Sequence, residues 1–351
     1  MAGAGGGDGT DGGSNGSGGS ASGGNGSGGS APSGSGGRGT GGRAGSGGAG
    51  TPGSGGTGTP ASGGAGGTVL AGSGCPLFTA DDAWNADVSA KAVDAAATTR
   101  LMALVGNVQI HPDFGAGFGI PINVVPETQA ALPVTFDQYP EESDPGPYPF
   151  PAMSAARLEG TTDPTSCDGD CHLLAVQRGT CMLYEGYTCR WASGGWRCGN
   201  GAKWDLKRKS TGQRMTGWTS ADAAGLPIYA GLARREEVLA GEITHAIRFT
   251  VKCTAPMYIA PATHQAVPGG CAGNTNAPPM GLRVRMKASF DINSYNATAQ
   301  VFLRAFKKYG MILADNGSNF YFQSEDHPAW DDDELNDLKR VPASAFEVVS
   351  P

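Results

Sequence analysis

The sequence lacks a hydrophobic run long enough to cross a membrane, a block of basic side chains and the glycine motifs that bind nucleotides. A spanning helix needs roughly 20 apolar residues, and no apolar run approaches that length. The 351 residues carry a formal net charge of −7, which argues against a nucleic-acid binder. GxGxxG and P-loop motifs are missing. We therefore expect no transmembrane segment, no nucleic-acid partner and no cofactor.

Apolar side chains are almost missing from the first 74 residues, which are nearly all Gly, Ser, Ala and Thr. Such a stretch cannot bury enough surface to offset the backbone entropy that is lost on ordering. We predict a disordered tether over 1–74 and a single globular domain over 75–351. Cutting the chain before Cys75 should then leave the melting temperature of the domain nearly unchanged.

Cysteine is missing from the tether, and all of it lies in the domain. The eight cysteines are Cys75, Cys167, Cys171, Cys181, Cys189, Cys198, Cys253 and Cys271. No CxxC pair occurs, so the spacing favours disulfides over a structural zinc, and we expect no metal site. Disulfides require an oxidising compartment, which predicts an extracellular or cell-surface protein.

One disulfide can be proposed from spacing. Cys253 and Cys271 enclose a short loop after a strand, and we predict that they bond to each other. Closing a loop of this size contributes about 3 kcal/mol in the chain-entropy model.

The N-terminus lacks the features of a signal peptide. Met1 is followed by AGAGGGDGT, which has neither a charged region nor an apolar one. Either export follows another route, or the true start codon lies upstream. We expect the second, with a signal peptide or lipoprotein anchor preceding this sequence.

Hydrophobic periodicity predicts a β-rich α+β domain, an antiparallel sheet or sandwich with a few packed helices. A helix that Ser89 caps is expected to end at Gly106, a second helix is expected over 296–309, and a short third helix begins at Asp331. Strands are expected over 122–125, 132–136, 172–176, 182–187, 242–252, 282–290 and 311–314.

Long motifs in this domain resemble those of a widespread group of secreted bacterial proteins to which no activity is attached. They are GWTSADAAGLPI (217–228), GEITHAIRF (241–249), PPMGLRVRMKASFDI (278–292) and YGMILADNGS (309–318), with weaker matches in ESDPGPYPFP (142–151) and CHLLAVQRGTCMLYE (171–185). Some members of the group occur beside carbohydrate-binding modules. The resemblance therefore implies an activity on glycans. This implication rests on the neighbouring modules and not on a known mechanism.

The first motif is rich in polar groups that a core strand would not need. Trp218 could bind a substrate there, and Asp222 could act as a general acid or base. The alternative is that Ser220 and Asp222 only cap a turn.

The predicted strand 242–252 and its neighbour 282–290 carry further candidates. His245 shares a face with apolar residues, as either a satisfied core histidine or a base that lines a cleft. Arg283 and Arg285 form a cationic stripe. Carboxylates of the protein itself could form ion pairs with these arginines, or the arginines could bind a carboxylated sugar such as a uronic acid.

Acids beside aromatic residues are typical of sites that bind sugars. The candidate catalytic acids are Asp144, Asp170 and Glu185, and Tyr148 and His172 are candidate substrate-binding residues. Asp315, in ADNG, is either catalytic or the start of a turn, and its position before Asn-Gly favours the turn.

These patterns favour a secreted polysaccharide-active enzyme, a glycoside hydrolase or a polysaccharide lyase, that works with acid and base residues in a sheet-lined cleft. The alternative is a non-catalytic glycan-binding or adhesion domain on a flexible tether. The sequence has no GxSxG or other serine-hydrolase signature. In both readings the partner is a polysaccharide or cell-wall glycan.

Overall fold

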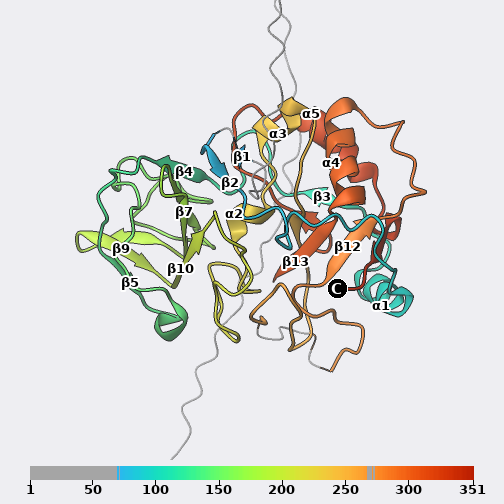
Figure 1. Ribbon diagram of the computed structural model, residues 1–351, viewed down its shortest axis with the longest axis horizontal. Coiled ribbons are helices and arrows are strands. Elements are labelled where there is room, and N and C mark those ends of the chain that lie inside the picture. Colours follow the sequence, from blue (N-terminus) through green and yellow to red (C-terminus); the bar gives the residue numbers. More distant parts are fainter. Residues whose placement is uncertain (1–68, 71, 267–270, 272) are drawn as a thin grey trace, which may run out of the picture. The chain divides into compact units, whose positions relative to one another are not determined.

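The computed structural model describes residues 69–351 except 71, 267–270 and 272 (Figure 1). Most of the predicted tether therefore lies outside the described residues. Within the described part the strands form four sheets, and five α-helices accompany them. The predicted β-rich α+β class is confirmed.

The largest sheet has six strands in the order β15-β12-β13-β11-β14-β3. Its strands are β3 (His111–Pro112), β11 (Ile247–Val251), β12 (Arg283–Met286), β13 (Met311–Asn316), β14 (Tyr321–Phe322) and β15 (Phe346–Val348). β11 pairs with β13 in parallel, and β14 pairs with β3 in parallel, while the other neighbours are antiparallel. The sheet is therefore mixed rather than purely antiparallel, and every residue of β11 is buried.

Two smaller sheets and a strand pair complete the β structure. The four-stranded sheet contains β10 (Asn200–Asp205), β7 (Met182–Tyr187), β6 (Leu173–Gln177) and β4 (Ile122–Val125), and the three-stranded sheet contains β5 (Val134–Phe136), β9 (Gly195–Cys198) and β8 (Arg190–Ala192). β1 (Val69–Leu70) pairs with β2 (Cys75–Pro76). In Figure 1 the labelled strands of these two smaller sheets lie to the left of β12 and β13.

The helices follow local sequence signals. They are α1 (Ala95–Val105), α2 (Ile228–Gly231), α3 (Arg235–Ala240), α4 (Ala297–Lys308) and α5 (Asp332–Asn336), with 3-10 turns at Pro140–Glu142, Asp337–Arg340 and Ala343–Ala345. Asn296 caps α4 by accepting a hydrogen bond from the Ala299 amide at 2.8 Å, and Asp331 caps α5. Both helices therefore begin where they were predicted.

The predicted start of the first helix is wrong. Asp94, not Ser89, caps α1 by accepting a hydrogen bond from the Ala97 amide at 2.8 Å. The segment before it is extended, because Val93 forms a β-bridge with Val349 near the end of the chain. A long-range strand contact therefore delays the helix by several residues.

The predicted strand over 242–252 begins only at Ile247. Gly241 has φ 86° and ends α3 in the left-handed conformation that glycine favours. His245 therefore lies in the connection before β11 and not on a strand. The strand predicted over 282–290 likewise ends at Met286.

Helix α4 supplies much of the apolar core against the six-stranded sheet. Phe302 lies 5.8 Å from Phe322 of β14, and Phe306 lies 5.7 Å from Phe346 of β15, measured between ring centroids. A second, separate apolar cluster under the smaller sheets includes Trp196. The core under α4 supports the sheet whose strand ends carry the site described below.

All eight cysteines are paired. The disulfides are Cys75–Cys181, Cys167–Cys171, Cys189–Cys198 and Cys253–Cys271. The predicted Cys253–Cys271 pair is confirmed. Four disulfides are typical of an extracellular protein. Among the described residues, no helix has the length and apolar character needed to cross a bilayer.

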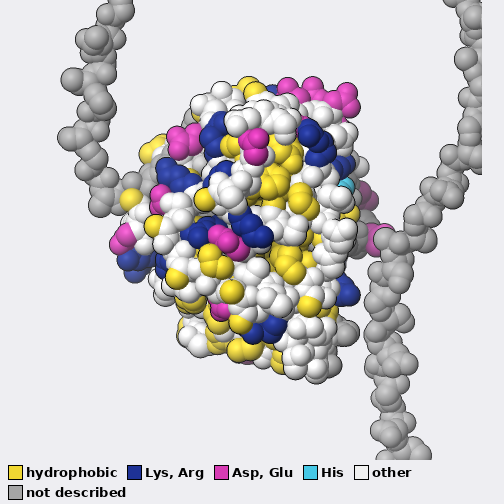
Figure 2. All heavy atoms as spheres, turned by 90° about the vertical axis from the view of Figure 1, so that its right-hand side faces the viewer, with side chains coloured by type: hydrophobic (Ala, Val, Ile, Leu, Met, Phe, Trp, Pro, Cys, Tyr) yellow, Lys and Arg dark blue, Asp and Glu magenta, His cyan; other side chains and the backbone are white. Residues whose placement is uncertain are grey.

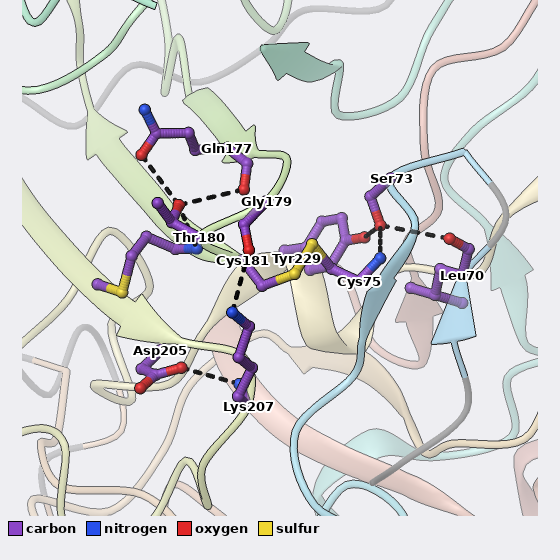
Figure 3. Close-up of a disulfide and its surroundings, with 11 residues drawn as sticks. Leu70, Ser73, Cys75, Gln177, Gly179, Thr180, Cys181, Asp205, Lys207 and Tyr229 are labelled. Atoms are coloured by element: carbon purple, nitrogen blue, oxygen red, sulfur yellow. Dashed lines mark hydrogen bonds between the residues drawn. A yellow bond between two sulfur atoms is a disulfide. The ribbon is translucent and has the colours of Figure 1, made fainter. Parts of the chain in front are cut away.

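Cys75–Cys181 fastens the start of the described chain to β7 (Figure 3). Beside it, the Ser73 hydroxyl accepts hydrogen bonds from the Cys75 amide and from the Tyr229 hydroxyl, both at 3.2 Å. Leu70 is buried in the main core. The described structure therefore includes residues that precede the expected domain boundary at 75.

The surface in Figure 2 carries no single-sign charge block. Lysine and arginine side chains are interspersed with acidic ones there, and hydrophobic side chains gather near the centre of the view.

We predict that residues 69–74 stabilise the domain. A chain that begins at Cys75 should unfold with a free energy about 2 kcal/mol lower than one that begins at Val69, because it loses the burial of Leu70 and the bonds of Ser73. Urea denaturation of both chains under oxidising conditions measures the difference. Equal midpoints would show that Cys75 itself is the boundary.

Candidate functional site

Two hollows in the surface meet at the ends of β13 and of the segment before β6. The tyrosine hollow, of about 490 Å³, is lined by residues that include Tyr139, Tyr187, Thr219, Ser220, His264 and Gln265. The charged hollow, of about 240 Å³, is lined by residues that include Asp113, Glu159, His172, Arg248, Tyr321 and Gln323. Both hollows share Asp170, Asp315 and Asn316.

One wall of the tyrosine hollow is the 217–227 loop, which contains most of the first sequence motif. The Thr219 amide donates to Glu142 Oε2 at 2.7 Å, and the Ser220 hydroxyl donates to the Leu226 carbonyl at 2.6 Å. The Ala224 amide donates to the Ala314 carbonyl of β13 at 3.0 Å. These bonds hold the loop against the strand end that carries Asp315.

Gly225 allows this loop to close. Its φ is 68°, and a β-carbon there would lie 2.6 Å from the Trp218 carbonyl oxygen and 2.1 Å from Thr263 Oγ1. A larger residue would force the loop away from its neighbours.

Asp222 lies behind the wall, where it pairs with Arg248 of β11. Both side chains are almost completely buried, and the Arg248 Nη2 to Asp222 Oδ2 distance is 3.0 Å. Burial disfavours the charged guanidinium, but Asp222 and then Asp315 outweigh it and raise the pKa of Arg248. The short contact between Arg248 and Asp222 identifies the two side chains as an ion pair, although burial, the largest effect, raises the pKa of Asp222 against the charge of Arg248. Asp222 also takes part in the turn, because its amide donates to Ser220 Oγ at 3.0 Å.

Asp315 has the most perturbed carboxyl group at the junction. Burial, and next the negative charge of Asp222, raise the pKa of Asp315 to about 7. One of its oxygens accepts a hydrogen bond from the Asn316 amide at 2.7 Å. Since Asp315 lies within β13, the predicted turn does not begin there. Its carboxyl group can hold a proton near neutral pH, as a general acid must.

Asp170 is the second acid of the junction, and it is exposed. It forms no ion pair with any described residue. It lies inside the loop closed by Cys167–Cys171, just before β6. The junction therefore combines one protonatable acid with one solvated carboxylate.

His172 has a structural rather than a substrate-binding environment. Its Nδ1 faces the Glu159 carboxylate, and its Nε2 lies 3.0 Å from the Ala221 carbonyl oxygen. Two acceptors require two N–H donors, so the ring is a cation. Burial lowers its pKa, but the Glu159 charge outweighs burial and raises the pKa of His172 to about 9.

The tyrosine hollow offers surfaces suited to sugar rings. Tyr139 is exposed at its edge, and Tyr187 lies deeper. Burial, then the charges of Asp170 and Asp315, raise the pKa of Tyr187 to about 12. His264 donates from Nδ1 to the Ala223 carbonyl at 2.8 Å when that nitrogen is protonated, which leaves Nε2 as an acceptor.

Asp144 and Tyr148 do not line either hollow. Asp144 Oδ2 lies 2.7 Å from Arg214 Nη1 and accepts from the Lys203 amide at 2.8 Å. Tyr148 is fully buried and donates its hydroxyl to the Asp144 carbonyl at 2.7 Å. The proline-rich segment is thus a support for the 217–227 loop, since Arg214 also donates to the Thr219 carbonyl.

Glu185 and His245 also serve the interior. Glu185 is fully buried and accepts hydrogen bonds from the Tyr229 amide at 2.8 Å and from Trp204 Nε1 at 3.1 Å. Burial raises the pKa of Glu185 to about 7. His245 Nε2 lies 3.1 Å from Glu237 of α3, which fits the satisfied core histidine.

The predicted substrate-binding arginines are occupied internally. Arg283 donates to the carbonyl oxygens of Ala83 and Tyr309, both at 2.6 Å. Arg285 pairs with Glu347 at 3.0 Å. Trp218 packs against another guanidinium, that of Arg214, at 5.4 Å from its ring centroid, and it lines neither hollow.

Of the residues named from the sequence, the structure places Asp170 and His172 at the hollows and Asp222 just behind them. Sequence reasoning missed Asp113, Arg248 and His264 as site residues. An arginine between Ile247 and Phe249 on a continuous apolar strand was the available signal, because a guanidinium buried there needs a carboxylate partner.

The described residues include no group of three or more His, Cys, Asp or Glu side chains that could hold a metal ion.

We predict a pH-dependent contribution of His172 to stability. Its folded pKa of about 9 lies above its ordinary value, so its stabilisation is complete below about pH 6.5 and is lost as pH rises towards 9. The difference in unfolding free energy between the natural protein and His172→Gln should shrink over this range. His327→Gln, a histidine outside both hollows, is the matched control. A difference that stays constant from pH 6.5 to 9.5 would show that His172 is not a cation in the folded protein.

No protein-family model, curated protein or solved structure matches this chain. The resemblance to a group of secreted bacterial proteins stays a prediction.

Proposed function

We propose that this protein is an extracellular or cell-surface glycoside hydrolase whose substrate lies across the two hollows, with its scissile bond at the junction. The observation that supports this most is the junction itself. Asp315, whose pKa is raised to about 7, and the solvated carboxylate of Asp170 are both shared by the two hollows. Glycoside hydrolysis uses such a pair, one carboxyl group protonated and one ionised.

In the proposed reaction Asp315 donates its proton to the glycosidic oxygen as the bond to the anomeric carbon breaks. Asp170 removes a proton from the attacking water, whose oxygen forms the new bond to that carbon. The products are two shorter sugars, and the proton on Asp170 returns to Asp315 through solvent.

The lining of the hollows agrees with a sugar substrate. Tyr139 and Tyr187 present aromatic surface on one side of the junction, and sugar rings stack on such surfaces. Thr219, Ser220 and Gln265 bring polar groups to the same hollow. A mixed aromatic and polar lining suits a neutral polyhydroxylated ligand.

Hydrolysis is favoured over the lyase alternative. A lyase that acts on a uronic acid needs an unpaired cation to bind the sugar carboxylate. In the charged hollow, Arg248 already pairs with Asp222 and His172 with Glu159. Arg283 and Arg285, expected to bind uronic acids, face internal carbonyl groups and Glu347.

We predict that Asp315→Asn lowers kcat on a cleaved polysaccharide by 10²-fold or more, because general acid catalysis contributes about 10²–10⁴-fold. Release of reducing ends from a panel of neutral and charged polysaccharides measures it. Asp333→Asn, at an exposed position of α5, is the control. Full activity of Asp315→Asn would show that Asp315 is not the general acid.

Asp222→Asn is a less clean test than the sequence suggested. It would leave the buried Arg248 without its ionic partner, which costs about 3–5 kcal/mol in comparable pairs. Lost activity in that variant would report folding as well as chemistry.

We also predict that kcat/KM falls as pH rises above about 7. The acid must be protonated, and Asp315 loses its proton around a pKa of about 7, so activity is present below this pH and declines about tenfold per pH unit well above it. Initial rates from pH 5 to 9 test this. A rate that rises steadily to pH 9 would contradict an acid at Asp315.

A non-catalytic glycan-binding domain is the second candidate. Three of the acids expected to be catalytic, Asp144, Glu185 and Asp222, instead form ion pairs or hydrogen bonds within the protein, which favours this candidate. Retention of a polysaccharide without release of reducing ends, unchanged in Asp315→Asn, would favour this reading.

A further inference from the structure

The charged hollow differs from its neighbour in carrying more negative than positive groups once its ion pairs are counted. Arg248 is matched by Asp222, and the His172 cation by Glu159. Two carboxylates on its lining, Asp113 and Asp170, take part in none of the ion pairs between described residues. Both cations on the lining therefore have ionic partners, whereas Asp113 and Asp170 have none among the described residues.

We infer that the charged hollow binds a sugar unit with a free primary ammonium group, so that the glycan cut at Asp315 contains de-N-acetylated amino sugars. The inference rests on the proposed hydrolase and names its substrate class. Asp113 would accept the charge-assisted hydrogen bond from the ammonium, a type stronger than bonds between neutral groups.

Asp113 forms an ion pair with none of the described cations. It follows β3, and the groups that face it are His111 of the same strand, Gln323, Glu159 and Arg248. Gln323 is neutral, and Arg248 is held by Asp222. Burial, the largest effect, raises the pKa of Asp113, and an ammonium group bound beside it would oppose this shift. Burial, and next the positive charge of Lys339, lower the pKa of His111, so this ring is neutral at pH 7. An incoming ammonium would supply the missing charge.

Asn316 provides a second, independent observation. Its Oδ1 is buried and accepts no hydrogen bond from any described residue, and Asn316 is among the residues that line both hollows. A buried amide oxygen without a donor is costly, and a small shift of the side chain would let it accept from an ammonium or hydroxyl group. Tyr321, stacked on His111 with ring centroids 4.3 Å apart, adds an aromatic surface that attracts cations.

An acidic sugar does not fit the same hollow. A carboxylate there would face Asp113 and Asp170 with no unpaired cation on the lining, and like charges repel at such distances. An N-acetylated sugar would bring no charge to meet Asp113. The hollow should therefore rank amino sugars above N-acetylated ones, and uronic acids last.

The test compares two matched ligands on the full chain. Calorimetric titration of Asp315→Asn with the β-1,4-linked glucosamine tetramer and with its fully N-acetylated counterpart gives both affinities without turnover. The amine tetramer should bind about tenfold more tightly, as expected for one charge-assisted bond. Adding Asp113→Asn should abolish that preference, whereas adding Asp333→Asn should preserve it. The ligand comparison does not depend on whether Asp113→Asn folds.

Cleavage of the same tetramers by the natural protein separates the two proposals. Equal or reversed affinities overturn the amino-sugar inference, and if either tetramer is cut the hydrolase proposal stands. Amine-dependent binding without cleavage of any polysaccharide supports the inference about the hollow and overturns the hydrolase. A preference that survives Asp113→Asn overturns the role of that carboxylate.

Discussion

A guanidinium buried in a sheet must be matched by a carboxylate, and this constraint determines how the two hollows are built. Arg248 lies on β11, which is buried throughout, and removing its charge from water costs several kcal/mol unless a partner is present. Asp222 supplies that partner from the 217–227 loop, so the loop must lie over the ends of β11 and β13. The wall of the tyrosine hollow and the negative charge behind Asp315 both follow from the same ion pair.

Most buried acids of this domain are committed to holding the chain together. Glu185 accepts hydrogen bonds at the start of α2, Glu237 faces His245, and Glu159 holds the His172 ring, which in turn bonds to the 217–227 loop. At the junction of the hollows the pattern changes, because Asp170 has no ionic partner in the described part of the chain and the surroundings of Asp315 raise its pKa. These two acids, which no ion pair among the described residues engages, are therefore the best candidates for catalysis.

Local features could be predicted from the sequence, and features that depend on distant partners could not. The helix starts at Asn296 and Asp331 and the strand over 182–187 follow from local patterns, and the structure has them where expected. The start of α1 depends on a bridge between Val93 and Val349, which no local pattern reveals. Arg283 was expected to face a ligand because the carbonyl oxygens it binds, at Ala83 and Tyr309, are remote in sequence. For Asp315, the Asn-Gly that follows favoured a turn, whereas the strand continues through Asn316.

The Cys75–Cys181 bond also determines how the domain would bear a mechanical load. A pull on the chain that precedes Val69 passes the β1–β2 pair and reaches Cys75, and from there the covalent bond carries it directly to β7. The bond spans 106 positions in sequence, which include α1 and Asp170. While it is intact, roughly 350 Å of contour length cannot be drawn out of the domain. Reduction of this bond would turn a nearly inextensible attachment into one that can lengthen as residues 76–180 unravel.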